Sequence, residues 1–166
     1  VYKSTDGGTT WKQLTNGLTN VIEANLAIAP SNTKVIYATV AVGTPTNSVT
    51  GVVNLYKSTD AGETWTQIPT MDQRPLGRIG GGDLPTIVVD PKNENVVYTA
   101  STVMWRSEDG GLTWTAVRGS PGGDDYQRIR INPNDPNIIL SVADQGGVVS
   151  SNHGQSWSSW YTQPTA

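Results

Sequence analysis

Apolar runs and short polar turns follow one another in a pattern that occurs three times along the chain. An apolar run, a turn rich in proline and asparagine, and a second apolar run occupy residues 28–38, 89–99 and 131–141, and the three segments align without gaps. Two apolar runs separated by such a turn are typical of antiparallel strands joined by a hairpin. No stretch has the periodicity of a long amphipathic helix. The pattern therefore predicts an all-β protein built from repeated strand pairs.

A second repeated element, Ser-x-Asp-x-Gly-x-x-Trp, occurs three times in full and a fourth time with Asn in place of Asp. The tryptophans of the four copies lie about 43 to 54 residues apart, a period that is typical of propellers and solenoids. The fixed positions of the four copies are Ser4, Asp6, Gly8 and Trp11, then Ser58, Asp60, Gly62 and Trp65, then Ser107, Asp109, Gly111 and Trp114, and finally Ser150, Asn152, Gly154 and Trp157.

This element resembles the Asp box of the bacterial neuraminidase repeat, and the resemblance implies a β-propeller. It places each box at the hairpin between the third and fourth strands of a four-stranded blade, with the box tryptophan of every copy buried against the sheet. It also predicts a half blade at residues 1–14 and full blades at 25–69, 86–118 and 127–161. The expected architecture is an arc of about three and a half blades from a seven-bladed ring.

The residue types within each box favour a structural role. The Asp carboxylate can accept N–H bonds inside the turn, and the Gly can adopt backbone angles that other residues resist. A calcium loop needs alternating acids and a Glu at its twelfth position, and neither is present. In the fourth box His153 follows Asn152, and the chain has no other His and no Cys. We therefore expect His153 to be an exposed turn residue, and we expect no metal site.

Composition narrows the classes of partner. The 166 residues contain no cysteine, so disulfides and thiolate metal sites are excluded, and the net charge is −3. Nucleic acids and anionic membranes usually need a basic protein face. No apolar run approaches the roughly 20 residues of a membrane span. We therefore expect no nucleic-acid partner, no membrane insertion and no cofactor.

Candidate binding residues lie in loops on the face opposite the boxes. That face is expected to carry an insertion within residues 43–54, the loops 71–83 and 119–127, and the turn 144–147. Carboxylates and guanidinium groups there can contact a sugar or an acidic ligand, and two carboxylates about 5 to 10 Å apart can hydrolyse a glycoside. The candidate catalytic residues are Asp83, Asp124, Asp125 and Asp144, and the candidate ligand-binding residues are Arg74, Arg78, Tyr126 and Gln145.

The segments 123–137, 144–146 and 156–166 are similar to bacterial Asp-box proteins labelled glycosyl hydrolase or sialidase-like. More loosely, the chain resembles xyloglucan-cleaving propellers and sortilin-type receptors. These resemblances imply an extracytoplasmic or secreted bacterial protein that binds a glycan or protein ligand or serves as a scaffold. The alternatives are part of a secreted glycoside hydrolase and an assembly-factor propeller for photosynthetic complexes. The three arginines with which sialidases clamp a substrate carboxylate are not evident in this sequence.

An arc of this size has unpaired edges. Propellers close at about four to eight blades, so the arc leaves a strand edge and an apolar blade face in contact with water. We therefore expect the rest of the ring to come from a longer chain or from a second copy. A homodimeric seven-bladed ring is the form expected from two copies.

Overall fold

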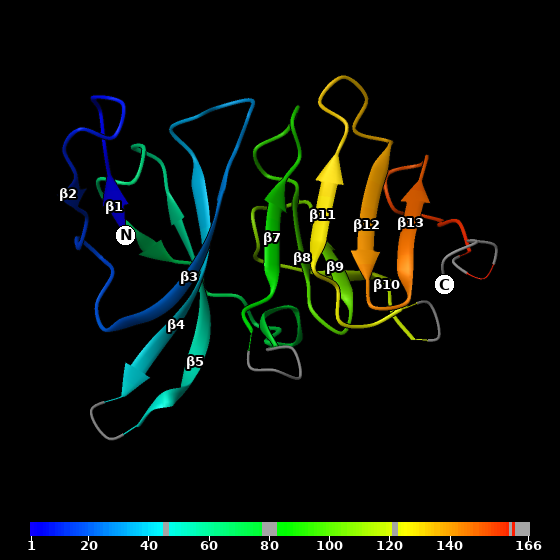
Figure 1. Ribbon diagram of the computed structural model, residues 1–166, viewed down its shortest axis with the longest axis horizontal. Helices are drawn as coiled ribbons and strands as arrows, with labels where there is room; N and C mark the ends of the chain where they lie inside the picture. Colours follow the sequence, from blue (N-terminus) through cyan, green and yellow to red (C-terminus); the bar gives the residue numbers. More distant parts are fainter. Residues whose placement is uncertain (45–46, 78–82, 121–122, 160, 162–166) are drawn as a thin grey trace.

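The computed structural model describes residues 1–44, 47–77, 83–120, 123–159 and 161. Within these residues the protein contains thirteen strands in four antiparallel sheets, and one short 3-10 turn at η1 (Arg74–Leu76). The sheets follow one another from β1 at one side of the molecule to β13 at the other (Figure 1). The all-β fold predicted from the sequence is confirmed.

Each sheet consists of strands that are consecutive in the sequence and pair in the order of the chain. The first sheet contains β1 (Tyr2–Lys3) and β2 (Lys12–Gln13). The second contains β3 (Val21–Ile28), β4 (Ile36–Thr44), β5 (Asn47–Ser58) and β6 (Thr66–Gln67). The third contains β7 (Thr86–Val89), β8 (Val97–Ala100), β9 (Met104–Ser107) and β10 (Thr115–Arg118), and the last contains β11 (Arg128–Ile131), β12 (Ile139–Ala143) and β13 (Gly146–Ser150).

The last sheet has three strands within the described residues, where we expected four. The chain nevertheless returns beside β13 after the fourth box. The Ser158 N–H donates to the Val149 carbonyl at 2.8 Å, and the Ser158 hydroxyl accepts the Val149 N–H at 2.9 Å. Residue 158 therefore occupies the place of a fourth strand without extending a ladder.

The box hairpins have the hydrogen bonds that their sequence predicts. The Asp60 carboxylate accepts the Thr64 N–H at 2.9 Å and the Thr64 hydroxyl at 2.6 Å, and these bonds lower the pKa of Asp60 to about 2. The Ser58 hydroxyl accepts the Gly62 N–H at 2.8 Å, and the Trp65 indole donates to the Gly62 carbonyl at 2.9 Å. Equivalent bonds occur in the boxes at 4–11 and 107–114.

The fourth box keeps this geometry although Asn152 replaces the acid. The Asn152 side-chain oxygen accepts the Ser156 N–H at 2.8 Å, and its amide donates to the Ser156 hydroxyl at 2.8 Å. His153, however, is not an exposed turn residue as we expected. Its Nε2 lies 3.0 Å from Oδ2 of the buried Asp90, and its carbonyl accepts a bond from Arg106 at 2.8 Å. The expectation is wrong because the box turn packs against the preceding sheet.

The box hairpin and the Pro/Asn hairpin of each blade are joined at one end. The residue after the box Asp or Asn has positive φ in every copy, and in the last three boxes its N–H donates to a carbonyl of the Pro/Asn turn. Ala61 bonds to Lys34 at 2.8 Å, Gly110 bonds to Asn95 at 2.8 Å, and His153 bonds to Asn137 at 3.0 Å.

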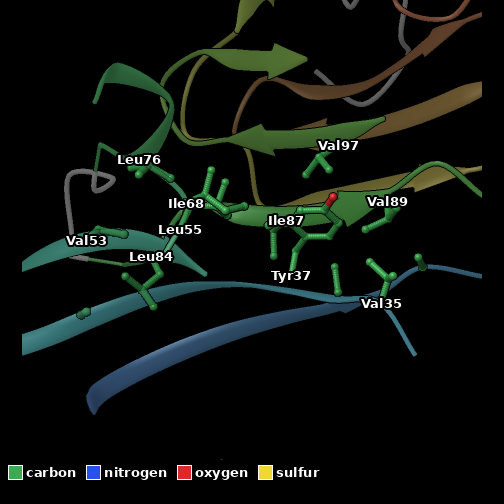
Figure 2. Close-up of a cluster of buried hydrophobic side chains, with 13 residues drawn as sticks. Val35, Tyr37, Val53, Leu55, Ile68, Leu76, Leu84, Ile87, Val89 and Val97 are labelled. Carbon is green, nitrogen blue, oxygen red and sulfur yellow. The ribbon is translucent and has the colours of Figure 1, made fainter. Parts of the chain in front are cut away.

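Apolar side chains fill the space between neighbouring sheets. Figure 2 shows the cluster between the second and third sheets, which gathers Tyr37 and Leu55 from one sheet and Ile87 and Val97 from the other. A second cluster lies between the third and last sheets and contains Tyr98, Met104, Tyr126, Ile129 and Ile139. Burial between sheets therefore provides the main hydrophobic stabilisation of the arc.

The four box tryptophans differ in burial. Trp65 is 5% exposed, and Trp114 and Trp157 are partly buried against the inter-sheet clusters. Trp11 is 63% exposed, so the prediction that all four are buried is wrong for this residue.

The reason is that each box packs against the sheet that precedes it in the chain. A Cβ added at Gly62 would lie 3.2 Å from the Leu14 side chain, and one added at Gly111 would collide with Leu55. A Cβ added at Gly8 would meet only the ring of Trp11 in its own box. Among the described residues, no earlier sheet covers the first box.

The insertion expected as a loop within residues 43–54 instead extends a hairpin. β4 runs to Thr44 and β5 begins at Asn47, with Val42 paired to Val52. The expectation of a variable loop is therefore wrong for most of this segment. Its β-branched residues continue the ladder, as their strand propensity favours. The hairpin extends beyond the neighbouring sheets (Figure 1).

Candidate functional site

Acidic residues from two neighbouring sheets meet near the first residues of the inner strands. Asp83 precedes β7, Asp124 and Asp125 precede β11, and Asp144 lies in the turn between β12 and β13. The charges of Asp144, Asp124 and Asp83 all act on Asp125. These four acids are the candidate catalytic residues of the sequence analysis, and their catalytic role stays a prediction.

The surroundings of Asp125 raise the pKa of its carboxyl group. Its backbone has a φ of 50°, and its carboxylate accepts a bond from the Gln127 amide at 3.1 Å. Partial desolvation raises the pKa of Asp125, and so do repulsion from Asp144 and Asp124 and a hydrogen bond with the Asp144 side chain. Negative charge on these neighbours disfavours the ionised form of Asp125. Asp125 and Asp144 therefore form a carboxyl pair.

Gln145 joins the two loops that carry these acids. Its side-chain oxygen accepts the Asp124 N–H at 3.2 Å, and its amide donates to the Asp124 carboxylate. The β12–β13 turn is therefore fixed against the segment before β11. Gln145 thus links the two loops in this structure, and its role as a ligand contact stays a prediction.

A polar cavity of about 210 Å³ lies between the inner strands beside the acids. Figure 1 shows these strands, β3, β7 and β11, side by side. The Asn25 amide donates to the carbonyls of Leu84 and Pro85 at 3.4 and 3.3 Å, which holds the segment before β7 against β3. The polar side chains that line the cavity are Glu23, Asn25, Asp83, Thr86, Gln127 and Arg128.

Several of these lining residues were not among our candidates. Glu23 and Asn25 are polar positions inside an otherwise apolar strand, and Arg128 begins the next blade. Polar residues that interrupt an apolar inner strand were the available signal. These residues become recognisable as one site only when the inner strands of three blades lie side by side. The sequence alone does not specify that arrangement.

Of the remaining candidates that the structure describes, Tyr126 also lines the cavity, whereas Arg74 does not. Arg74 binds the Asp72 carboxylate through Nε at 2.9 Å and Nη2 at 2.7 Å, and its guanidinium lies 4.8 Å from the centre of the Trp105 ring. Tyr126 is fully buried, and burial raises the pKa of its hydroxyl. The Arg74 guanidinium is thus paired with an acid of its own loop. Tyr126 packs in the core beneath the segment that carries Asp124 and Asp125. Arg78 lies outside the described residues.

A larger groove, of about 620 Å³, runs between β1 and β3. It is lined mainly by apolar side chains such as Leu14, Leu18 and Ile22. The smaller cavity is lined mainly by polar side chains, so it is the better candidate for a polar ligand. Among the residues that the structure describes, no group of three or more His, Cys, Asp or Glu side chains has a metal-binding arrangement. The same residues contain no helix that could serve as a membrane span.

Comparisons with known proteins agree with this architecture. The family model of the BNR/Asp-box repeat matches residues 2–13. A xyloglucanase from Paenibacillus sp is 32% identical over 121 residues, which cover 69% of this chain and 11% of the relative. The chain thus spans about a tenth of the length of this curated relative.

Solved structures share the fold at lower identity. The GH74 xyloglucanase from Xanthomonas campestris matches with a TM-score of 0.67 and 20% identity, over 98% of this chain and 27% of that one. The GH74 enzyme from Niastella koreensis gives 0.63 and 23%, over 87% and 23% of the two chains. YCF48 bound to a D1 peptide gives 0.58 and 18%, over 95% and 46%. This chain is therefore an Asp-box repeat β-propeller protein, similar in sequence to a xyloglucanase and in fold to GH74 enzymes.

Proposed function

We propose that the polar cavity between β3, β7 and β11 is a binding site for a neutral polysaccharide of the xyloglucan type. The observation that carries the proposal is the grouping of carboxylates and amides at the inner strands of three blades, in a chain 32% identical to a xyloglucanase. Sugar hydroxyl groups both donate and accept hydrogen bonds. Carboxylates, side-chain amides and a guanidinium can satisfy them together.

The charge of the cavity favours a neutral ligand over an acidic one. Glu23 and Asp83 line it, the Asp125–Asp144 pair lies beside it, and Arg128 is the one basic side chain among its described lining residues. An anionic sugar would meet net negative charge, whereas a neutral glucan would not. A glycan ligand also favours the extracytoplasmic or secreted location, where plant-type polysaccharides occur. A protein ligand is the alternative occupant, since YCF48 is solved with a D1 peptide.

Hydrolysis of the glycan is a second candidate function, and the Asp125–Asp144 pair favours it. A carboxyl group with a raised pKa can remain protonated and act as a general acid. A hydrolase needs a second carboxylate at least about 5 Å away, which is farther than a hydrogen-bonded pair allows. Asp125 and Asp144 would then serve as one acid, and the opposing carboxylate would be Asp83 or Glu23.

Calorimetric titration of the purified chain with xyloglucan oligosaccharides tests the proposal. Binding is expected, with affinity reduced at least about tenfold by Asp83→Ala or Glu23→Ala, because each removes a carboxylate that lines the cavity. Glu94→Gln, in a Pro/Asn turn away from the cavity, is the matched control and should bind like the wild type. A folded chain that binds sialyllactose but no neutral glucan would overturn the assignment. Release of reducing ends from the polysaccharide separates hydrolysis from binding.

A further inference from the structure

In two neighbouring blades a basic residue lies directly opposite a tyrosine on the second and third strands. Lys57 pairs with Tyr37 in the second sheet, and Arg106 pairs with Tyr98 in the third. Residues opposite one another in antiparallel strands place their side chains on the same face of the sheet. The box turn of the following blade packs against that face in both cases. Each of these two interfaces between blades therefore contains one cation beside one tyrosine.

The cation of the third sheet has its partners within the protein. The Arg106 guanidinium lies 3.0 Å from a carboxylate oxygen of Glu108 in the third box, and it donates to the His153 carbonyl at 2.8 Å. The Tyr98 hydroxyl donates to the same carbonyl at 3.4 Å. Only 16% of the Arg106 side chain is exposed. An acid of its own blade and a carbonyl of the next box turn thus compensate for the burial of this charge.

Lys57 has neither kind of partner. Thr59 stands in the second box where Glu108 stands in the third, and Gly110 takes the place of the histidine. The partly buried Lys57 ammonium lies 5.1 Å from the centre of the Tyr37 ring, and no acid among the described residues forms an ion pair with it. The Tyr37 hydroxyl is buried and has no hydrogen-bond partner in the part of the chain that the structure describes. Because buried charges are normally paired, this interface lacks an anion that its neighbour contains.

A groove of about 270 Å³ opens beside the Lys57 ammonium, between the outer strand β6 and the third box turn. Thr59 and Asp109 also line it, as does Thr66, which is paired with Lys57 across the sheet. The third blade is already packed against the second here, so the groove is the space that remains open after the two blades have met. The Asp109 carboxylate accepts hydrogen bonds from its own box. Lys57 is therefore the charged group that the groove offers to a ligand.

We propose that this groove binds the carboxylate of an acidic side chain, glutamate or aspartate, on a partner peptide. In the third blade the Glu108 carboxylate already binds Arg106 in this way. The Lys57 ammonium would donate to the incoming carboxylate, and the Thr59 and Thr66 hydroxyls can donate to its remaining lone pairs. The volume is below the roughly 300 Å³ of a typical small-molecule pocket, so it suits one side chain rather than a run of sugar units. The groove shares no lining residue with the glycan cavity, so the two proposals are independent.

Nuclear magnetic resonance of the nitrogen-labelled full chain tests this site. A short glutamate peptide, acetylated and amidated at its ends, is titrated into the protein. The backbone amide signals of Thr59, Thr66 and Gly110 should shift and saturate, with a dissociation constant of about 1 mM that weakens as salt is added. The matched glutamine peptide keeps the size and the amide groups but has no charge, so it should leave these signals in place. Glucuronate is titrated separately as an acidic sugar.

Three variants assign the binding to Lys57. Lys57→Met removes the charge and keeps the length of the side chain, so it should weaken binding of the glutamate peptide at least tenfold. Thr59→Glu places the acid of the third box beside Lys57, so it should fill the groove from within and weaken binding as much, and it tests the site even if Lys57→Met fails to fold. Lys92→Met, at an exposed lysine that does not line the groove, should bind like the wild type.

Three results would overturn the proposal. The first is a wild type whose signals do not saturate, or that binds the glutamine peptide equally well. The second is undiminished binding of the glutamate peptide by folded Lys57→Met or Thr59→Glu. The third is binding of glucuronate at these signals without binding of the glutamate peptide, which would assign the groove to an acidic sugar instead.

Discussion

Trp65 and Trp11 occupy the same position of two boxes. Comparing the stability lost in Trp65→Ala and Trp11→Ala therefore separates the free energy of packing against the preceding sheet from the free energy of the box turn itself. Each indole donates to the carbonyl of a box glycine, at 2.9 and 3.0 Å. Trp65 is 5% exposed and packs with Leu18, Val40 and Tyr56, whereas Trp11 is 63% exposed. The hydrogen bond within the box turn is therefore the same at both sites, whereas only Trp65 packs against a preceding sheet.

The exposures give the expected magnitudes. A tryptophan side chain has roughly 200 Å² of surface, and burying apolar surface stabilises a protein by about 25 cal/mol per Å². The near-complete burial of Trp65 therefore contributes about 5 kcal/mol to the free energy of unfolding. The buried third of Trp11 contributes about 2 kcal/mol on the same scale. Trp65→Ala should therefore lower the free energy of unfolding by about 3 kcal/mol more than Trp11→Ala.

Urea unfolding followed by circular dichroism measures this difference. The slopes of the unfolding free energy against urea must agree between the two variants. Trp11→Ala is the matched control, because it deletes the same atoms and the same indole bond. Losses within about 1 kcal/mol of each other would show that the box itself, rather than packing on the preceding sheet, provides the stability.

Two further predictions follow from the turns. The pKa of Asp6 and of Asp60 is lowered to about 2 by bonds from Thr10 and Thr64, so the folded state binds these protons less tightly than the unfolded chain. The stabilisation from these two carboxylates should be complete above about pH 4 and lost as the pH falls toward 2. Asp60→Asn should therefore make the unfolding midpoint depend less on pH over that window. An unchanged pH dependence would contradict the prediction. In thermal unfolding, Gly111→Ala should destabilise the chain by about 2 kcal/mol more than Gly7→Ala. The reason is that a Cβ added at Gly111 collides with Leu55, whereas one added at Gly7 meets open space. Equal losses of stability would refute the packing of the third box against Leu55.

The sequence by itself determined the elements whose interactions are local. A Pro/Asn turn between apolar runs specifies a hairpin within about a dozen residues, and the bonds of an Asp box all form within one octapeptide. The fourth box shows how far this holds, since Asn152 makes the bonds of the missing acid. The all-β fold, the repeat and the position of the boxes were predictable for this reason.

The candidate site was predictable only in part. Asp83, Asp124, Asp125 and Asp144 were selected because they lie in loops on one expected face, and in the structure the charges of the other three act on Asp125. Their catalytic role stays a prediction. Glu23 and Arg128 were missed, because the cavity forms between inner strands of three blades. Tyr126 was selected for its place in a polar loop, yet its ring fills the core below that loop.

Tertiary structure alone decided the features that depend on which surface faces which. Trp11 and Trp65 have the same local sequence and the same turn, and only the sheet in front of Trp65 makes it a core residue. His153 has no local partner, and it meets Asp90 because two blades pack together. Local hydrogen bonds form within a few residues and are encoded there. Burial and charge proximity are properties of the packed blades, so they appear only when the blades are placed against one another.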